Sequence, residues 1–412
     1  MTQAAPPPRS HRDEDADCRQ VEGPLAILLI FLRLGCTCFG GPIAHLGYFR
    51  AEFVARRRWL SERAYGDLVA LAQFLPGPAS SQTGFALGLM RAGLPGAIAA
   101  WTGFTLPSAV LLVLFALGAG RIADSPAGAG LLHGLKLVAV AIVAQAVLGM
   151  ARSLCPDRTR ASIAVVALGA MLLARWPILQ LAVVLGGGVA GLVFCHGEAP
   201  VAPEGLAVGL SRRRAALSLI AFFLLLGFAF LPQAAGGLAL FAAFYRAGAL
   251  VFGGGHVVLP LLRDAVVGPG WVHQDAFLAG YGAAQAVPGP LFTFAAYLGA
   301  LAAPAPGPLL GAAIGLLGIF LPGMLCLMGT LPFWHGLRAR PRAQAAMRGT
   351  NAAVVGLLAA ALYAPLWTSA VHGPGDVAVA AVGFVLLTAW QAPPLLVVGL
   401  AALAGLGMGV FG

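Results

Sequence analysis

Charged side chains are scarce in this chain, and acidic side chains are the scarcest. Only 10% of the 412 residues are charged, with 15 Asp and Glu against 25 Lys and Arg. A soluble domain usually carries about 25% charged residues. So few charges exclude a water-soluble globular protein. Acidic residues are almost absent from the apolar stretches, and this argues against a pump for cations, which needs buried carboxylates.

The chain also lacks the sequence patterns of enzymes and redox proteins. It contains no His-Glu-x-x-His, Gly-x-Ser-x-Gly or Gly-x-x-x-x-Gly-Lys motif. Its six cysteines are scattered, and a role as small apolar residues in helices explains them better than a redox or metal-binding role. We therefore expect no enzymatic activity, no catalytic residue, no metal site and no cofactor.

Long apolar stretches dominate what remains. The chain is 59% hydrophobic with a mean hydropathy of +0.88. Windows such as 94–120, 130–151 and 308–331 are long enough to cross a hydrocarbon core of about 30 Å as helices. In lipid the backbone must satisfy its own hydrogen bonds, so helices are expected. The net charge of +10 comes from Arg residues in short loops, which is typical of a membrane protein in a lipid bilayer and not of a nucleic-acid partner.

The chain repeats itself. Phe31-Leu-Arg33-Leu-Gly35 matches Phe244-Tyr-Arg246-Ala-Gly248, and Phe39-Gly40-Gly41 matches Phe252-Gly253-Gly254, 213 positions later. Pro76-Gly77-Pro78 matches Pro288-Gly289-Pro290 at 212 positions, and Gly134 falls on Gly349 at 215. Matched Gly, Pro, Trp and Gln residues in one order, at a near-constant offset, predict a duplicated protein.

The repeat sets the predicted domain organisation. Residues 1–23 are predicted to form a disordered cytoplasmic tail, 24–196 the N-terminal repeat, 197–236 a linker with one extra transmembrane helix at 215–231, and 237–412 the C-terminal repeat. Each repeat contains six apolar segments. The extra helix would turn the second half over relative to the first. The sequence thus predicts an all-α polytopic membrane protein with two homologous halves in inverted orientation.

Loop charge agrees with inversion. The loop at 50–63 holds five Arg residues, and its counterpart at 263–275 holds one. The loop at 338–348 holds four, and its counterpart in the first half holds Arg121. The arginine-rich loop therefore follows the first segment in one half and the third segment in the other, as opposite orientation of the two halves requires. All Arg clusters fall on the cytoplasmic side if the first two segments of each half enter the membrane and return, which predicts broken or re-entrant helices.

Glycine and proline interrupt these segments at matched positions. The first pair of interruptions is Gly40-Gly41-Pro42 and Gly253-Gly254-Gly255-His256. A helix that restarts inside the membrane points free N–H groups and the positive end of its dipole at the break, and so offers an anion site without a formal charge. Close packing of helices through small residues is the alternative interpretation.

The second pair is formed by the two Pro-Gly-Pro blocks. Their prolines remove backbone donors and fix φ, so neither segment can run as one regular helix. Small polar groups follow each break, and a glutamine precedes it by one helical turn. A purely structural kink is the alternative. The candidate anion-pathway residues here are Gln73, Pro76, Gly77, Pro78, Ser80 and Ser81 in one half, and Gln285, Pro288, Gly289, Pro290 and Thr293 in the other.

Basic residues within the apolar segments complete the candidate pathway. Arg33 and Arg246 are equivalent in the repeat and precede the glycine clusters, where they could supply positive charge to a dianion. Snorkelling of these side chains to the interface is the alternative. His256 is either a proton carrier or a neutral donor. Lys136 has the neutral counterpart Asn351, and a structural role fits it better.

These motifs resemble the chromate ion transporter family. The resemblance rests on Phe39 to Pro42, Arg56-Arg57-Arg58-Trp59-Leu60, Gln73 to Pro78, the string Gly253-Gly-Gly-His-Val-Val-Leu-Pro260 and Gly280 to Pro290, and it extends over about 25–411. It implies a multi-pass carrier of the bacterial inner membrane that exports chromate and confers resistance. An inside-negative membrane potential favours the exit of a dianion, so export needs no ATP. A transporter of another oxyanion such as sulfate, or an anion channel, stays open, as does assembly as a homodimer. The N-terminus is expected in the cytoplasm.

Overall fold

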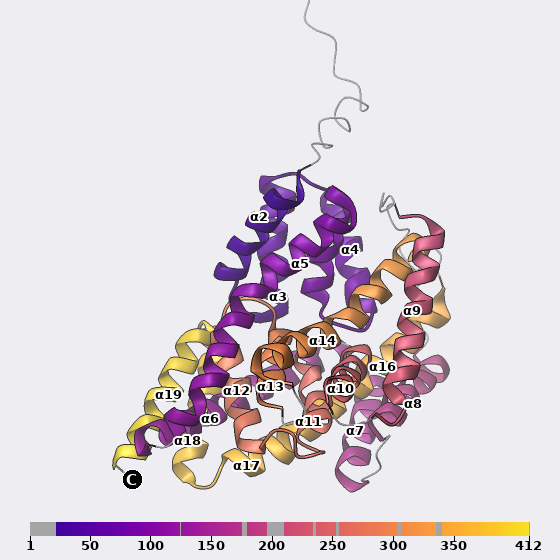
Figure 1. The fold of residues 1–412 in the computed structure, drawn as a ribbon. Helices are drawn as coiled ribbons and strands as arrows, with labels where there is room; N and C mark the ends of the chain where they lie inside the picture. The colour runs from indigo at the N-terminus through magenta and orange to yellow at the C-terminus, as the bar shows by residue number, and fades with distance from the viewer. Residues whose placement is uncertain are drawn as a thin grey trace, which may run out of the picture.

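The chain folds into a bundle of helices in a computed structural model that describes residues 22–123, 125–174, 179–195, 210–233, 236–252, 255–302, 306–334 and 340–411. Within these residues every regular element is a helix, and strands are absent (Figure 1). The all-α prediction is therefore confirmed. The predicted tail at 1–21 and most of the linker before 210 lie outside the described residues.

The first half follows the segments expected from the sequence. Its elements are α2 (Pro24–Thr37), α3 (Gly41–Phe49), the π-helical η1 (Arg50–Arg56), α4 (Glu62–Phe74), α5 (Ala79–Ala123), α6 (Pro126–Leu154), α7 (Arg158–Leu173) and α8 (Leu179–Phe194). The long α5 is bent at Ala92 and at Gly93, which has φ +62°. That bend separates the expected second and third segments.

The second half repeats this order after the extra helix α9 (Arg212–Phe230). Its elements are α10 (Gly237–Ala249), η2 (Gly255–Val257), α11 (Val258–Val266), α12 (Gln274–Ala286), η3 (Leu291–Thr293), α13 (Phe294–Leu301), α14 (Pro308–Thr330), η4 (Leu331–Phe333), α16 (Pro341–Ala361), η5 (Leu362–Trp367), α17 (Thr368–Ala370), α18 (Pro374–Thr388) and α19 (Pro394–Phe411). Tyr245 Oη donates to the carbonyl of Phe222 over 3.1 Å, which ties α9 to α10.

The predicted breaks in the helices are present. Residues 38–40 separate α2 from α3, and residues 75–78 separate α4 from α5. In the second half, α10 ends at Ala249 and α12 ends at Ala286. With 14 residues, α2 is about 21 Å long, less than the hydrocarbon core needs. These helices are broken, as the sequence predicts.

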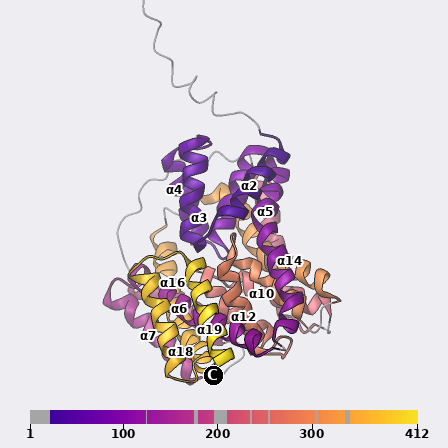
Figure 2. The same ribbon diagram turned by 90° about the vertical axis from the view of Figure 1, so that its left-hand side faces the viewer.

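The two halves exchange their last helices. The pair α7 and α8 packs on α16 of the second half, and the pair α18 and α19 packs on α6 of the first half. Figure 1 shows α6 beside α18 and α19 at one side of the molecule and α7, α8 and α16 at the other; Figure 2 shows the first group from the front. The equivalent contacts occur twice, so the halves are related by an approximate two-fold rotation. Their orientation relative to a bilayer stays a prediction.

Glycines make this exchange possible. A methyl group on Gly134 of α6 would lie 2.1 Å from the carbonyl oxygen of Ala401 in α19. At the equivalent position, a methyl group on Gly349 of α16 would lie 2.1 Å from the carbonyl oxygen of Gly187 in α8. The backbones therefore touch directly, which is the small-residue packing used where lipid provides no hydrophobic drive between helices.

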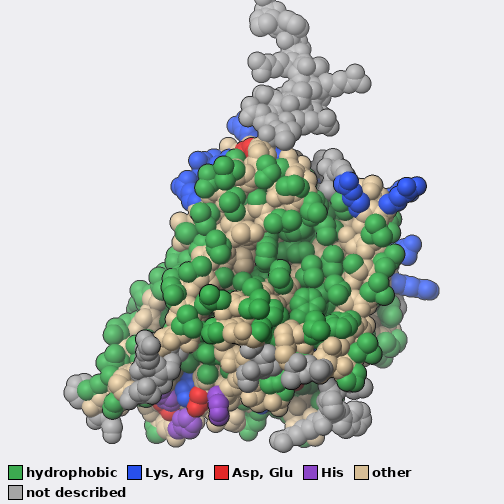
Figure 3. All heavy atoms as spheres, in the orientation of Figure 1, with side chains coloured by type: hydrophobic (Ala, Val, Ile, Leu, Met, Phe, Trp, Pro, Cys, Tyr) green, Lys and Arg blue, Asp and Glu red, His purple; other side chains and the backbone are tan. Residues whose placement is uncertain are grey.

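The outer surface is that of a membrane protein. Large apolar side chains lie exposed, among them Leu173 at 89%, Val166 at 71% and Leu309 at 72%. Figure 3 shows apolar side chains across most of one face, with Lys and Arg at the top and right and histidine and acidic side chains gathered at the lower left. Among the described residues, five helices are long and apolar enough to cross a membrane, in the ranges 79–118, 126–154, 212–230, 308–333 and 341–370. A polytopic protein in lipid accounts for this surface.

Candidate anion site where four chain breaks meet

The four helix breaks join in pairs, each pair linking the two halves. The amide of Gly77 donates to the carbonyl of Val251 over 2.8 Å, and the amide of Gly289 donates to the carbonyl of Cys38 over 2.9 Å. Each Pro-Gly-Pro break thus bonds to the glycine break of the other half. The sequence predicts that these breaks face a shared pocket, and the structure brings them together.

The approximate two-fold axis passes through this meeting point. Pro42 and Gly255 are equivalent in the repeat, and a methyl group on Gly255 would lie 3.0 Å from Pro42 Cγ. Two equivalent residues can be neighbours only near the axis that exchanges them. A site here is built equally from both halves.

Backbone conformation explains the glycines. Gly40, Gly41, Gly77 and Gly289 have φ of +96°, +76°, +116° and +99°, in the left-handed region that other residues rarely adopt. Space is restricted too, since a methyl group on Gly77 would lie 3.0 Å from Gly323 Cα and one on Gly289 2.9 Å from Ser108 Oγ. Gly77 and Gly289 therefore need glycine for both space and conformation, whereas Gly41 has open space and needs it for conformation alone.

Helix N-termini point their free amides into the breaks. α3 starts at Gly41, α5 at Ala79, η2 at Gly255 and η3 at Leu291. The amide of Gln82 already bonds to the carbonyl of Pro78 over 2.9 Å, so the first-turn amides before it are the free ones in α5. The positive end of the long α5 favours an anion at this point.

His45 is a candidate that the sequence analysis does not single out. Its side chain is buried, with 1% exposed, its ring meets the Phe104 ring edge-on at 5.3 Å, and its Nδ1 lies 3.5 Å from Ser80 Oγ. Its Nε2 has no hydrogen-bond partner among the described residues. Its position in the sequence could have identified it, because His45 follows the Gly-Gly-Pro break by one helical turn and its side chain therefore lies close to that break.

Other unpartnered polar atoms belong to residues adjacent in sequence to Ser80 and Phe104, the two residues that His45 contacts. Ser81 Oγ is buried without a partner next to Ser80, and Thr105 Oγ1 is buried without a partner next to Phe104, as the described residues show. An unsatisfied buried polar group costs about 1–3 kcal/mol. The Ser81 hydroxyl in the first turn of α5 and the His45 imidazole can serve a ligand, because hydroxyl and imidazole N–H donors suit the oxygens of an oxyanion.

Two polar side chains brace the breaks: Gln82, which is not among the predicted pathway residues, and Thr293, which is. Gln82 Nε2 donates to the carbonyls of Pro76 and Gly323, both over 2.9 Å, and Thr293 Oγ1 donates to the carbonyl of Pro290 over 2.7 Å. Gln285 is half-buried, with its Nε2 free of a partner in the described chain, whereas Gln73 is exposed on α4. The two equivalent glutamines are therefore in different surroundings. Gly253, Gly254 and the side chain of His256 lie outside what the structure describes.

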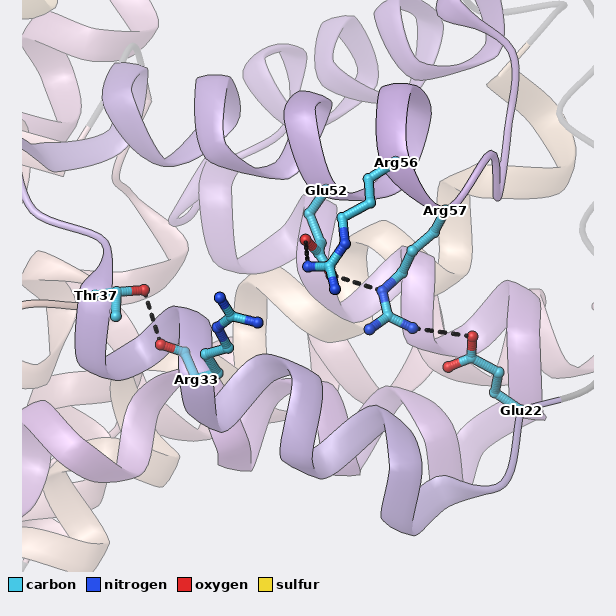
Figure 4. A network of polar contacts seen from close by, with 6 residues as sticks. All are labelled: Glu22, Arg33, Thr37, Glu52, Arg56 and Arg57. Carbon is cyan, nitrogen blue, oxygen red and sulfur yellow. Dashed lines mark hydrogen bonds and ion pairs between the residues drawn. The ribbon is translucent and has the colours of Figure 1, made fainter.

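Arg33, the first of the basic candidates, lies on the helix that precedes the first glycine break. Arg33 is exposed on α2 beside a network in which Arg56 and Arg57 contact Glu52 at 2.9 and 2.6 Å (Figure 4). In that view the backbone carbonyl of Arg33 accepts a hydrogen bond from Thr37 Oγ1 over 2.8 Å, and its guanidinium makes no bond with the residues drawn. Among the described residues its guanidinium has no acidic partner.

The side chains of Arg246 and Lys136 already have interaction partners. Arg246 Nη1 donates to the carbonyl of Ala229 over 2.9 Å and its guanidinium lies over the Phe230 ring, so it holds the C-terminal end of α9. Lys136 Nζ pairs with Asp275 Oδ1 at 3.0 Å. Arg33 and Arg246 thus differ in environment although the repeat makes them equivalent.

Comparison with known proteins gives one consistent result. A family model described as Chromate transporter matches residues 25–192 and again 238–406. The chain is 31% identical to a chromate transport protein of Pseudomonas aeruginosa, over 95% of this chain and 90% of that one. It is 28% identical to a probable chromate transport protein of Synechococcus elongatus (91% and 93%) and 27% identical to a chromate transport protein of Cupriavidus metallidurans (92% of each). No solved structure matches significantly.

Proposed function

This chain belongs to the chromate transporter family, and from that premise we propose that it exports chromate from the bacterial cytoplasm as a secondary transporter and so confers chromate resistance. The single observation that carries the proposal is the meeting of four chain breaks at one point, with hydrogen bonds from Gly77 to Val251 and from Gly289 to Cys38. Helix N-termini from both halves converge there, as a doubly charged anion requires.

The proposed binding site has three components. Free first-turn amides of α3 and α5, held in place by the turns at Gly77 and Gly289, bind the oxyanion. The hydroxyl of Ser81 and the Nε2 nitrogen of His45 donate hydrogen bonds, because both atoms are buried without a partner in the described chain, while His45 Nδ1 contacts Ser80 Oγ. Arg33 and the neighbouring Arg cluster attract the anion toward the mouth of the pathway.

The membrane potential supports the direction. Chromate is a dianion at neutral pH, and a cell that is negative inside favours its exit by about 4.6 kcal/mol per 100 mV for two charges. Export therefore needs no ATP. We place the protein in the inner membrane with its N-terminus in the cytoplasm, because that orientation puts the Arg residues at 50–63 inside.

Transport by purified protein tests the proposal. Proteoliposomes would take up radioactive chromate while potassium and valinomycin set the membrane potential and buffers set the pH gradient, each varied alone. We expect saturable uptake that rises with an inside-positive potential and that unlabelled chromate inhibits more strongly than sulfate. Uptake equal to that of protein-free liposomes would refute the proposal. Stronger inhibition by sulfate would assign another oxyanion as the cargo, and uptake that never saturates would indicate a channel.

A further inference from the structure

Two histidines and an aspartate from different halves meet where α6 contacts the start of α18. His133 belongs to α6, His372 precedes α18, and Asp376 lies in the first turn of α18. Their ligand atoms all lie within 4.8 Å of one another. His133 Nε2 is 2.7 Å from Asp376 Oδ1, and the two histidine rings stack with 5.9 Å between centroids.

Backbone contacts fix the carboxylate of Asp376. Its Oδ2 accepts from the amide of His372 over 2.8 Å and from the amide of Gly373 over 3.2 Å. The other oxygen, Oδ1, then faces His133. Carboxylates held in this way are oriented before a metal arrives. Asp376 is buried, His133 half-buried and His372 exposed, so an ion can enter from one side.

We propose that His133, His372 and Asp376 bind one divalent first-row transition-metal ion, with Zn²⁺ as the ion that the donors suit best. Two imidazoles and one carboxylate are ligands for Zn²⁺, Co²⁺ or Ni²⁺, whereas Mg²⁺ and Ca²⁺ take mostly oxygen ligands. Three protein ligands leave a fourth position for water. Ligand atoms on tetrahedral Zn²⁺ are about 3.3 Å apart, so the ion replaces the short His133–Asp376 bond after a small rotation of the imidazole.

The local charge permits a cation. Asp376 contributes one negative charge to the ligand set. Lys136 lies one turn further along α6, and its ammonium group is already paired with Asp275 at 3.0 Å. At the lower left of Figure 3, histidine and acidic side chains gather around a basic side chain, away from the Lys and Arg side chains at the top.

The duplication does not account for this cluster. Position 348 is equivalent to position 133, and Arg348 there donates through Nη2 to the carbonyl of Cys195 over 2.7 Å. The second half thus uses an arginine to hold the end of α8 where the first half has a histidine. A bound metal at His133 would join α6 to α18, the helices exchanged between the halves.

A hydrogen-bonded cap of α18 is the competing interpretation, and cobalt binding separates the two. The full-length protein in detergent, without a histidine tag and stripped with EDTA, would be titrated with Co²⁺ alone while visible absorption is recorded. We expect one Co²⁺ per chain with d–d bands that Zn²⁺ abolishes. His133→Ala and His372→Ala are expected to lose this signal, and Asp376→Asn, which keeps an oxygen for the cap, is expected to weaken it at least tenfold.

His273→Ala is the matched control, because His273 is exposed and is not among the three clustered ligands. It should bind Co²⁺ like the unchanged protein. Absence of the bands in the unchanged protein, or equal binding by the His133→Ala and His372→Ala variants, would overturn the proposal. An equal loss in His273→Ala would also overturn it. Thermal unfolding without metal checks that each variant is folded, since a cap alone would change stability without changing the spectrum.

Discussion

Pro42 and Gly255 occupy equivalent positions in the two halves and lie against each other, so that a methyl group on Gly255 would come within 3.0 Å of Pro42 Cγ. Their contact places the approximate two-fold axis at the chain breaks. An anion bound there would meet donors from both halves.

The Gly77 and Gly289 turns give the first prediction. Gly77→Ala and Gly289→Ala force a side chain into φ of +116° and +99° against close neighbours. A strained residue of this kind costs about 1–3 kcal/mol, so we expect chromate uptake to fall by roughly tenfold or more. Gly149→Ala is the control, since Gly149 is helical with open space around it. Normal uptake by both variants would contradict a role for these turns.

His45 gives the second prediction. His45→Phe keeps the ring against Phe104 and removes both nitrogens, so we expect kcat/KM for chromate to fall by about tenfold to a hundredfold, the value of one hydrogen bond to a charged group. Size-exclusion chromatography checks folding. His273→Phe, at an exposed histidine, should transport normally. An unchanged kcat/KM in folded His45→Phe would remove His45 from the site.

Arg33 gives the third prediction. Its guanidinium has no acidic partner among the described residues, and if it attracts chromate its effect must be screened by salt. Arg33→Ala should raise KM several-fold at low ionic strength and little at high ionic strength, with kcat unchanged. Arg33→Lys keeps the charge and should resemble the unchanged protein. A defect that is equal at all salt concentrations would indicate a structural role.

The glycine contacts between exchanged helices give the fourth prediction. A methyl group on Gly187 would lie 2.4 Å from Ala353 Cβ, whereas the neighbouring Gly186 has nothing within 4 Å. Overpacking costs about 1–3 kcal/mol, so Gly187→Ala should lower the unfolding temperature by several degrees and Gly186→Ala should not. Tryptophan fluorescence during heating measures both. Equal stability of the two variants would show that α8 does not pack on α16 in this way.

The sequence predicted the helices and their breaks well because both leave local signals. Apolar segments of membrane length and matched Gly and Pro residues identify α2 to α19 closely. The meeting of the breaks followed from the duplication, since two related halves share an axis. The chromate transporter resemblance is confirmed over both halves.

Long-range contacts were beyond prediction. His133 and Asp376 are 243 positions apart, so their spacing gave no sign of a metal site, and we expected none from the sequence. The partner of Arg246, the carbonyl of Ala229, depends on how α9 docks. His45 was missed because a single histidine in an apolar helix becomes a candidate only when its buried neighbours are known.

The exchange of helices also limits the order of assembly. α6 is covered by α19, whose last residue is Phe411, and α7 and α8 have no surface to cover until α16 has been made. During synthesis the first half therefore enters the membrane before any helix covers α6 and before α7 and α8 have a helix to pack on. Final packing of α6 must wait until α19 has been made, and a product truncated before α19 would expose the glycine-lined side of α6 to lipid or to a second copy.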